Sequence, residues 1–244
     1  MRQRSVVLAV AGMVCVSCVS LSATSRPHHA HSSTATPTFL NAERVTRVDI
    51  GVLVLAHGGS QEWDDTVRQA VRDAQLPVPT MAAFGMGMHP QELVQLQQAV
   101  DLLEQQGVQR LVVVPLLVSS HSEVFRQYEY LFGIRQQAEW PEAGPPIRRH
   151  ASIIMGTPLD DHPVVADVLA DRAVSLSETP AHETVVLVAH GPNGDRDNAR
   201  WLEAMEHVAK LLKERSGFLR VVTVTMRDDA TGSVKRDVLP IGQR

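Results

Sequence analysis

One motif occurs twice along the chain and constrains its fold more than any other feature. Residues 52–60 read Val-Leu-Val-Leu-Ala-His-Gly-Gly-Ser, and residues 185–191 read Val-Val-Leu-Val-Ala-His-Gly. An unbroken apolar run that ends in His-Gly is typical of a strand that is buried on both faces and delivers an imidazole to its carboxyl edge. Open α/β sheets bind their ligands at that edge. Because about one small-domain length separates the two histidines, His57 and His190, the chain is predicted to contain two related α/β units.

Strand and helix signals alternate through the first unit. Apolar runs at 48–56, 81–84, 111–118 and 147–155 predict four strands, and helical spacing predicts helices that begin after Ser60, at Pro90, after residue 122 and at Pro163. This alternation predicts an α/β fold with a parallel sheet flanked by helices. Pro115 lies inside the third run, although proline removes a hydrogen-bond donor from a central strand.

The second copy is shorter than the first. It predicts a strand that ends at His190, a helix that Gly217 ends, and a strand at 219–226. We therefore expect a tandem repeat with an incomplete second copy, a first domain over 47–178 and a partial second domain over 184–244. Such a half-domain has to cover its sheet edge with the first unit or with another chain, which leaves a homodimer open.

The N-terminal segment is typical of an exported protein. Residues 1–25 begin with Arg2 and Arg4, continue with an apolar run over 6–19 and end in small residues, as a secretory signal peptide does. The apolar run is shorter than a bilayer-spanning helix requires. We expect an exported, periplasmic protein with no membrane span in the mature chain, followed by a flexible linker over 26–46.

Both cysteines, Cys15 and Cys18, lie inside this leader. Small apolar residues of a signal peptide explain them better than redox chemistry does, and acylation of Cys18 would give a lipid-anchored form. Removal of the leader would leave no thiol, so a metal site in the mature chain has to use His, carboxylate or Met.

Composition restricts the partners. The chain has 244 residues, 44% of them hydrophobic, which suffices for a sizeable core, and its formal net charge of -4 gives no basic surface for nucleic acid. We therefore expect a small-molecule or protein partner and no nucleic acid.

Histidines follow each of the first three predicted strands at equal intervals. They are His57, His89 and His121, and parallel strands bring their carboxyl ends to one edge. Imidazoles without thiols suit divalent ions such as cobalt, nickel, iron or zinc. For each histidine alone, a hydrogen-bonded turn residue is the alternative, most of all for His89.

These residues resemble a known family, the class II, ATP-independent chelatases of the sirohydrochlorin cobaltochelatase and ferrochelatase group. The similarity covers roughly residues 48–227, and its most specific block is the run Val-Val-Val-Pro-Leu-Leu-Val-Ser-Ser-His-Ser-Glu-Val over 112–124. The family also has such a proline in this strand. The resemblance implies two tandem chelatase-like domains, with the metal held by His57 and His121 and a tetrapyrrole in the cleft above the sheet.

The implied activity is insertion of a divalent metal into sirohydrochlorin or a related tetrapyrrole, a step of cobalamin biosynthesis when the metal is cobalt. Cobalt is the first expectation, with iron or nickel as alternatives, and no organic cofactor is needed. His57 and His121 are assigned jointly to metal delivery and to removal of the pyrrole protons. Where the family has a glutamate after the second strand, this chain has Met86, so His89, a methionine or water is expected as the third ligand.

Backbone and hydroxyl donors at the same edge are candidates for the carboxylates of the substrate. They are Gly58, Gly59, Ser119 and Ser120. Arg126 either adds positive charge there or is a solvated helix residue. His190 is expected to be structural, because the second copy lacks the segment that would supply a counterpart of His121.

Two other functions are alternatives for this sequence. A non-catalytic exported carrier of metal or tetrapyrrole on the same fold is the main alternative, because export separates the protein from cytoplasmic tetrapyrrole synthesis and Met86 replaces an acid. Histidine phosphatases also have His-Gly after a first strand, but they place arginine before the histidine, where this chain has Ala56.

Overall fold

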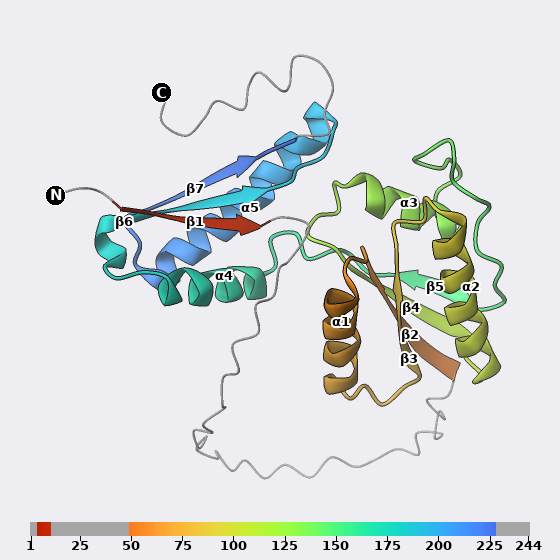
Figure 1. Cartoon of the computed structure of the whole chain (residues 1–244). Coiled ribbons are helices and arrows are strands. Elements are labelled where there is room, and N and C mark those ends of the chain that lie inside the picture. The colour runs from red at the N-terminus through yellow and green to blue at the C-terminus, as the bar shows by residue number, and fades with distance from the viewer. Residues whose placement is uncertain (1–3, 11–48, 228–244) are drawn as a thin grey trace, which may run out of the picture.

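The computed structural model describes residues 4–10 and 49–227, which form two parallel sheets, each with its own apolar core (Figure 1). The first sheet has the strand order β3-β2-β4-β5, and the second has the order β1-β6-β7. Every strand pair in both sheets is parallel. The predicted α/β class with parallel sheets flanked by helices is confirmed.

The first unit follows the predicted alternation. Its elements are β2 (Ile50–Ala56), α1 (Gln61–Asp73), β3 (Thr80–Phe84), α2 (Pro90–Gln105), β4 (Arg110–Leu116), α3 (Glu123–Leu131) and β5 (Ser152–Met155). Local signals set the boundaries, since the Ser60 hydroxyl accepts a hydrogen bond from the Trp63 amide at 3.3 Å and Pro90 begins α2.

Helices cover both faces of the first sheet. Leu53, Leu55 and Val113 point toward the core that α2 and α3 complete, and α1 lies on the opposite face (Figure 1). Alternate residues of a strand point to opposite faces, so a continuous apolar run supplies apolar side chains to the helices on both faces of the sheet.

Pro115 fits this sheet because of where β5 ends. The Val113 carbonyl accepts a hydrogen bond from the Gly156 amide at 2.8 Å, so the odd-numbered residues of β4 bond toward β5. The pairing of β4 with β5 stops at Val113 and Met155. At Pro115 the neighbouring strand has already ended, and the missing N–H removes no ladder bond.

Strand β5 is shorter than the predicted run over 147–155. Side chains of α2 bind the backbone that precedes it: Gln97 donates to the Arg148 carbonyl at 2.7 Å, and Glu104 accepts from the His150 amide at 2.6 Å and from the Ala151 amide at 2.8 Å. Backbone groups engaged in this way are not available to a ladder, so the strand begins only at Ser152.

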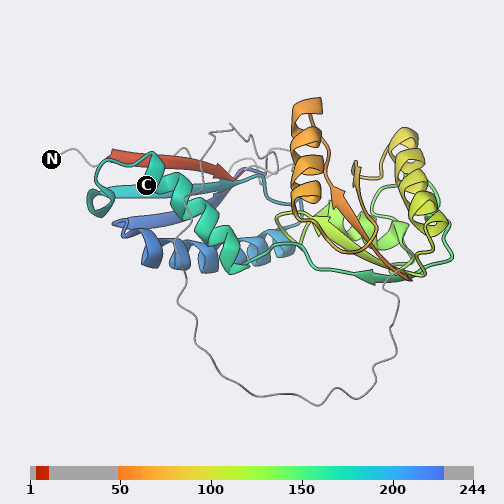
Figure 2. The same ribbon diagram turned by 90° about the horizontal axis from the view of Figure 1, so that it is seen from below.

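The second unit contains β1 (Arg4–Val10), α4 (Pro163–Ser175), a short 3-10 helix η2 (Pro180–His182), β6 (Glu183–Ala189), α5 (Asp195–Ser216) and β7 (Arg220–Thr225). Helices α4 and α5 pack together on one face of its sheet (Figure 2). Ala166, Leu169 and Ala173 of α4 lie in the second core, so this helix does not pack where a first domain over 47–178 would put it. The spatial boundary between the two cores precedes α4.

Residues 4–10 form β1, which pairs with β6 from Arg4 opposite Glu183 to Val10 opposite Ala189. The sequence instead predicts a signal peptide here. In the second sheet β1 occupies the side of β6 that corresponds to the place of β4 beside β2. The rest of the predicted leader, the linker over 26–46 and residues 228–244 of the predicted second domain lie outside the described residues.

None of the helices in the described ranges combines the length and the apolar character that crossing a bilayer demands.

Candidate metal-binding site

The strand order places the topological switch point of the first sheet between β2 and β4. After β2 the chain turns to α1 and then to β3 on one side, whereas after β4 it turns to α3 and then to β5 on the other side. Loops that leave neighbouring strands in opposite directions open a crevice at the carboxyl edge. Ala56 lies opposite Leu116 in the register of these two strands, so His57 and the loop that carries His121 emerge from adjacent strands at that crevice.

A hydrogen bond fixes the tautomer of His57. Its Nδ1 lies 2.9 Å from the Gly58 carbonyl oxygen, and a carbonyl can only accept, so Nδ1 carries the proton. The lone pair is therefore on Nε2, which is the arrangement that metal-binding histidines use. Gly58 has a φ of +83°, and a Cβ there would lie 3.2 Å from the Gly85 amide nitrogen, so the turn needs glycine to pack against the loop after β3.

Tyr128 ties the loops after β2 and β3 to α3. Its side chain is 1% exposed, and its hydroxyl donates to the Gly85 carbonyl at 2.7 Å and lies 3.3 Å from the Ala56 carbonyl. Burial, and then the negative charge of Glu92, raise the pKa of this phenol above its ordinary value. The hydroxyl therefore stays a neutral donor that links the end of β2 and the loop after β3 to α3.

The loop that carries His121 is held by its own hydroxyl and by an aspartate. The buried Ser119 hydroxyl accepts from the His121 amide at 3.1 Å, and Asp160 accepts from the Ser120 amide at 2.7 Å. Ser122 caps α3 by accepting from the Phe125 amide at 3.1 Å. Of the groups predicted as donors to substrate, the Ser120 amide is bound inside the protein, whereas the Ser119 hydroxyl acts here as an acceptor.

His89 and Met86 lie on the loop between β3 and α2. Glu92 accepts from the amides of Gly87 at 2.9 Å and Met88 at 3.2 Å, which fixes this loop from the first turn of α2. His89 is exposed and immediately precedes α2. Across residues 49–227 no three or more His, Cys, Asp or Glu side chains form a group that could hold a metal ion, so His57, His89 and His121 are not a preformed three-ligand site.

The second unit repeats the His-Gly turn and brings its loop to α3. His190 Nδ1 lies 2.8 Å from the Gly191 carbonyl, and Gly191 has a φ of +76°, as in the first copy. The Asn193 amide donates to Glu123 at 3.0 Å, and Arg126 pairs with Asp197 at 2.9 Å. Arg126 is therefore neither solvated nor directed at a substrate.

Three residues that the sequence did not single out as site residues hold the loops at this edge: Glu92, Tyr128 and Asp160. Each bonds backbone groups of a loop, and no spacing pattern marks such contacts. The sequence signal that points to the loop after β3 is the pair Gly85 and Gly87. Both residues have a positive φ, which favours glycine.

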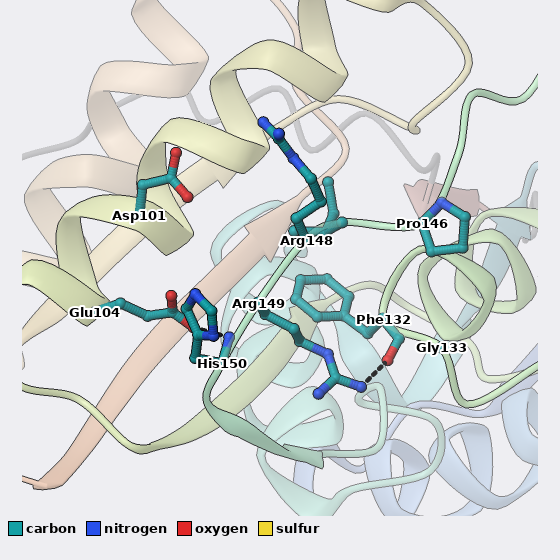
Figure 3. Close-up of a pocket in the computed structure, with 9 residues that line it drawn as sticks. Asp101, Glu104, Phe132, Gly133, Pro146, Arg148, Arg149 and His150 are labelled. Carbon is teal, nitrogen blue, oxygen red and sulfur yellow. Dashed lines mark hydrogen bonds between the residues drawn. The ribbon is translucent and has the colours of Figure 1, made fainter.

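A hollow of about 700 Å³ lies elsewhere, at the amino edge of the first sheet (Figure 3). Arg149, which lines it, donates to the Phe132 carbonyl at 2.9 Å and to the Ala151 carbonyl at 3.0 Å, and the Glu104 carboxylate accepts from two amides. These polar groups hold the connection into β5, so the hollow is a structural feature away from His57 and His121.

Comparison with known proteins agrees with the fold. A solved structure of SirB from Bacillus subtilis with Fe3+ is similar, with a TM-score of 0.53 and 19% sequence identity over 75% of this chain and 67% of that chain. DR2241 from Deinococcus radiodurans, described as a multi-domain protein with structural similarity to chelatases and two additional novel domains, gives a TM-score of 0.46 and 21% identity over 72% of this chain and 39% of that chain. No curated protein matches significantly. The family model named CbiX matches residues 51–176, more than half of the chain, and the chain therefore belongs to the CbiX family.

Proposed function

We propose that the protein inserts a divalent metal into a tetrapyrrole without ATP, with His57 and His121 as the residues that handle the metal. The observation that carries this proposal is the contact of His57 Nδ1 with the Gly58 carbonyl, which leaves Nε2 as the nitrogen available to a metal, on a strand adjacent to the one that leads to His121. Membership of the CbiX family supports the reaction class.

The chemistry suits two imidazoles better than a tight metal cage. In metallation the divalent ion leaves its protein ligands and binds the four ring nitrogens. Two pyrrole N–H protons are lost as these metal–nitrogen bonds form. A site of two neutral imidazoles and water releases the ion more readily than a closed four-ligand site, and an imidazole freed of metal accepts a proton near neutral pH. The metal is a substrate here, and no organic cofactor takes part.

Cobalt and sirohydrochlorin are the substrates we favour. Iron and nickel are the alternatives for the metal, and the Fe3+ in the SirB structure supports iron. Gly58 and Gly59 are the donors that we assign to the carboxylates of the ring. The Gly59 amide itself donates to Asp64 at 3.1 Å, so its binding to the ring requires that bond to open.

The test is metallation by the full chain. Sirohydrochlorin and Co²⁺, mixed with the protein and without ATP, should show the absorbance change of metallation well above the rate without protein. His57→Ala and His121→Ala should each lower that rate by roughly 10²-fold or more, which is the range for loss of a catalytic ligand or base. His207→Ala, an exposed histidine on α5 paired with Asp161, is the matched control and should keep full activity. Full activity in folded His121→Ala would refute the assignment.

A carrier function is the second candidate, because export would separate the protein from cytoplasmic tetrapyrrole synthesis and Met86 stands where the resembled family has glutamate. The same assay separates the two functions. Binding of ring or cobalt by the wild-type protein with no metallation would favour the carrier.

A further inference from the structure

The two units are joined where the loop after β6 contacts the first turn of α3. The Asn193 amide donates to Glu123 Oε1 at 3.0 Å, and Arg126 Nη1 donates to Asp197 Oδ2 at 2.9 Å. Glu123 follows His121 by two residues, and Asn193 follows His190 by three. The contact therefore links the loops of the two His-Gly repeats.

Arg126 is oriented for this contact from within the first unit. Glu139 takes two of its nitrogens, Nε at 2.9 Å and Nη2 at 2.8 Å, and the arginine side chain is only 19% exposed. This pairing raises the pKa of Arg126 and lowers that of Glu139. The guanidinium is planar, so binding of Nε and Nη2 by Glu139 also fixes the direction of Nη1, which donates to Asp197. The ammonium group of a lysine would not be held in one direction in this way.

The second unit is equally rigid on its side of the contact. Arg227, at the end of β7, donates to the Pro192 carbonyl at 3.0 Å and to the Asn193 carbonyl at 2.6 Å, and it pairs with Asp195 at 2.8 Å. Its side chain is almost fully buried. These bonds fix the loop after β6 to the end of β7, so we expect this loop to move together with its own sheet.

We infer that Arg126 is a positioning residue that sets where the His190 turn lies relative to the His121 loop. This inference rests on the proposed function, in which a tetrapyrrole lies against the crevice of the first unit. Both proposed metal-handling histidines belong to the first unit, and in this inference the ring extends from them to the loop after β6, which α3 contacts through Glu123 and Arg126. Loss of the Arg126 link consequently weakens ring binding and leaves cobalt binding at the histidines unchanged.

Two variants isolate the link. Arg126→Ala removes all of its ion pairs, and Asp197→Asn weakens only the pair between the units. Arg215→Ala is the matched control, because Arg215 joins α5 to Asp167 of α4 at 2.6 Å inside the second unit. Circular dichroism confirms folding of each variant, and Asp197→Asn, a change at a less buried side chain, remains the test if Arg126→Ala does not fold.

Amide hydrogen exchange reports on the link without reference to activity. Exchange at Asn193 should accelerate by roughly three- to tenfold in Arg126→Ala and Asp197→Asn, as expected for loss of a partly buried ion pair, and should stay unchanged in Arg215→Ala. Unchanged exchange at Asn193 in both variants would overturn the inference.

Binding then separates positioning from a merely structural role. The dissociation constant for sirohydrochlorin, or its KM where turnover is observed, should rise by a similar factor, with kcat and the cobalt dissociation constant unchanged. An equal loss of cobalt and ring binding would contradict the positioning role. If the wild-type protein binds the ring but does not metallate it, the proposed function fails while exchange and ring binding still decide the role of Arg126.

Discussion

Replacing Tyr128 with phenylalanine tests how the crevice is built. The hydroxyl donates to the Gly85 carbonyl at 2.7 Å, and the neighbouring Ala56 carbonyl also accepts from the Gly85 amide at 3.1 Å. Tyr128→Phe therefore leaves the Gly85 carbonyl without this donor and leaves Ala56 satisfied. Loss of one partner from a buried carbonyl costs about 1–3 kcal/mol, so we expect the free energy of unfolding to fall by that amount at pH 7.

The effect has a pH dependence of known sign. Burial raises the pKa of Tyr128 in the folded protein, whereas the unfolded chain keeps a value of about 10. The neutral phenol thus contributes stability that is fully present below pH 10 and is lost as the pH rises from there toward the folded-state pKa. The wild-type protein should lose up to about 1.4 kcal/mol per pH unit above pH 10 from this group, and the phenylalanine variant should not.

Urea unfolding from pH 7 to pH 11 measures both effects. Tyr130→Phe is the matched control, because Tyr130 lies on the same helix, is half-buried and has a hydroxyl that bonds to no other described residue. The gap between wild type and Tyr128→Phe should narrow above pH 10, and Tyr130→Phe should stay near wild type at pH 7. Equal stability of Tyr128→Phe and wild type at pH 7 would refute the reasoning.

Two further predictions concern the glycines and the N-terminus. Gly217→Ala should cost about 1 kcal/mol, because its φ of +73° is strained for alanine but nothing lies within 4 Å of the new Cβ. Gly87→Ala has a similar φ of +77°, and its Cβ would clash with Leu131 Cδ1, so urea unfolding should show an additional loss of about 1–3 kcal/mol, and equal losses would contradict the argument. We also propose export, so the mass of the protein made in an exporting host should correspond to cleavage near residues 23–25; a product that retains residues 4–10 would instead keep β1 in the folded protein.

Local signals predicted most of the first unit. The helix cap at Ser60, the proline at the start of α2 and the glycine that ends α5 each act within one turn of the chain, so the sequence window contains their partners. The placement of α4 could not be predicted in the same way. An apolar stripe that includes Ala166 and Leu169 fits either sheet, and the choice of the second core depends on contacts with α5 that follow later in the chain.

The candidate site was predictable only in part for the same reason. Two apolar strands that end near His57 and His121 place both loops at one edge, and the register confirms this. The groups that hold those loops are remote: Tyr128 bonds Gly85 and Asp160 bonds Ser120, both across about forty residues. Such pairs follow from the packing of helices on the sheet, and one sequence without its fold does not contain them.

The two His-Gly turns show why one motif can have two roles. Each histidine directs Nδ1 to the carbonyl of the next residue, and each glycine has a positive φ close to the other's. The backing differs, because Gly58 packs on the Gly85 amide, whereas a Cβ at Gly191 would lie 2.7 Å from Thr225 Cβ. The turn is thus a local unit that orients an imidazole wherever it occurs. Its surroundings differ between the two copies: beside β2, strand β4 leads to the loop that carries His121, whereas beside β6, strand β7 leads to Arg227, which donates to the Pro192 carbonyl.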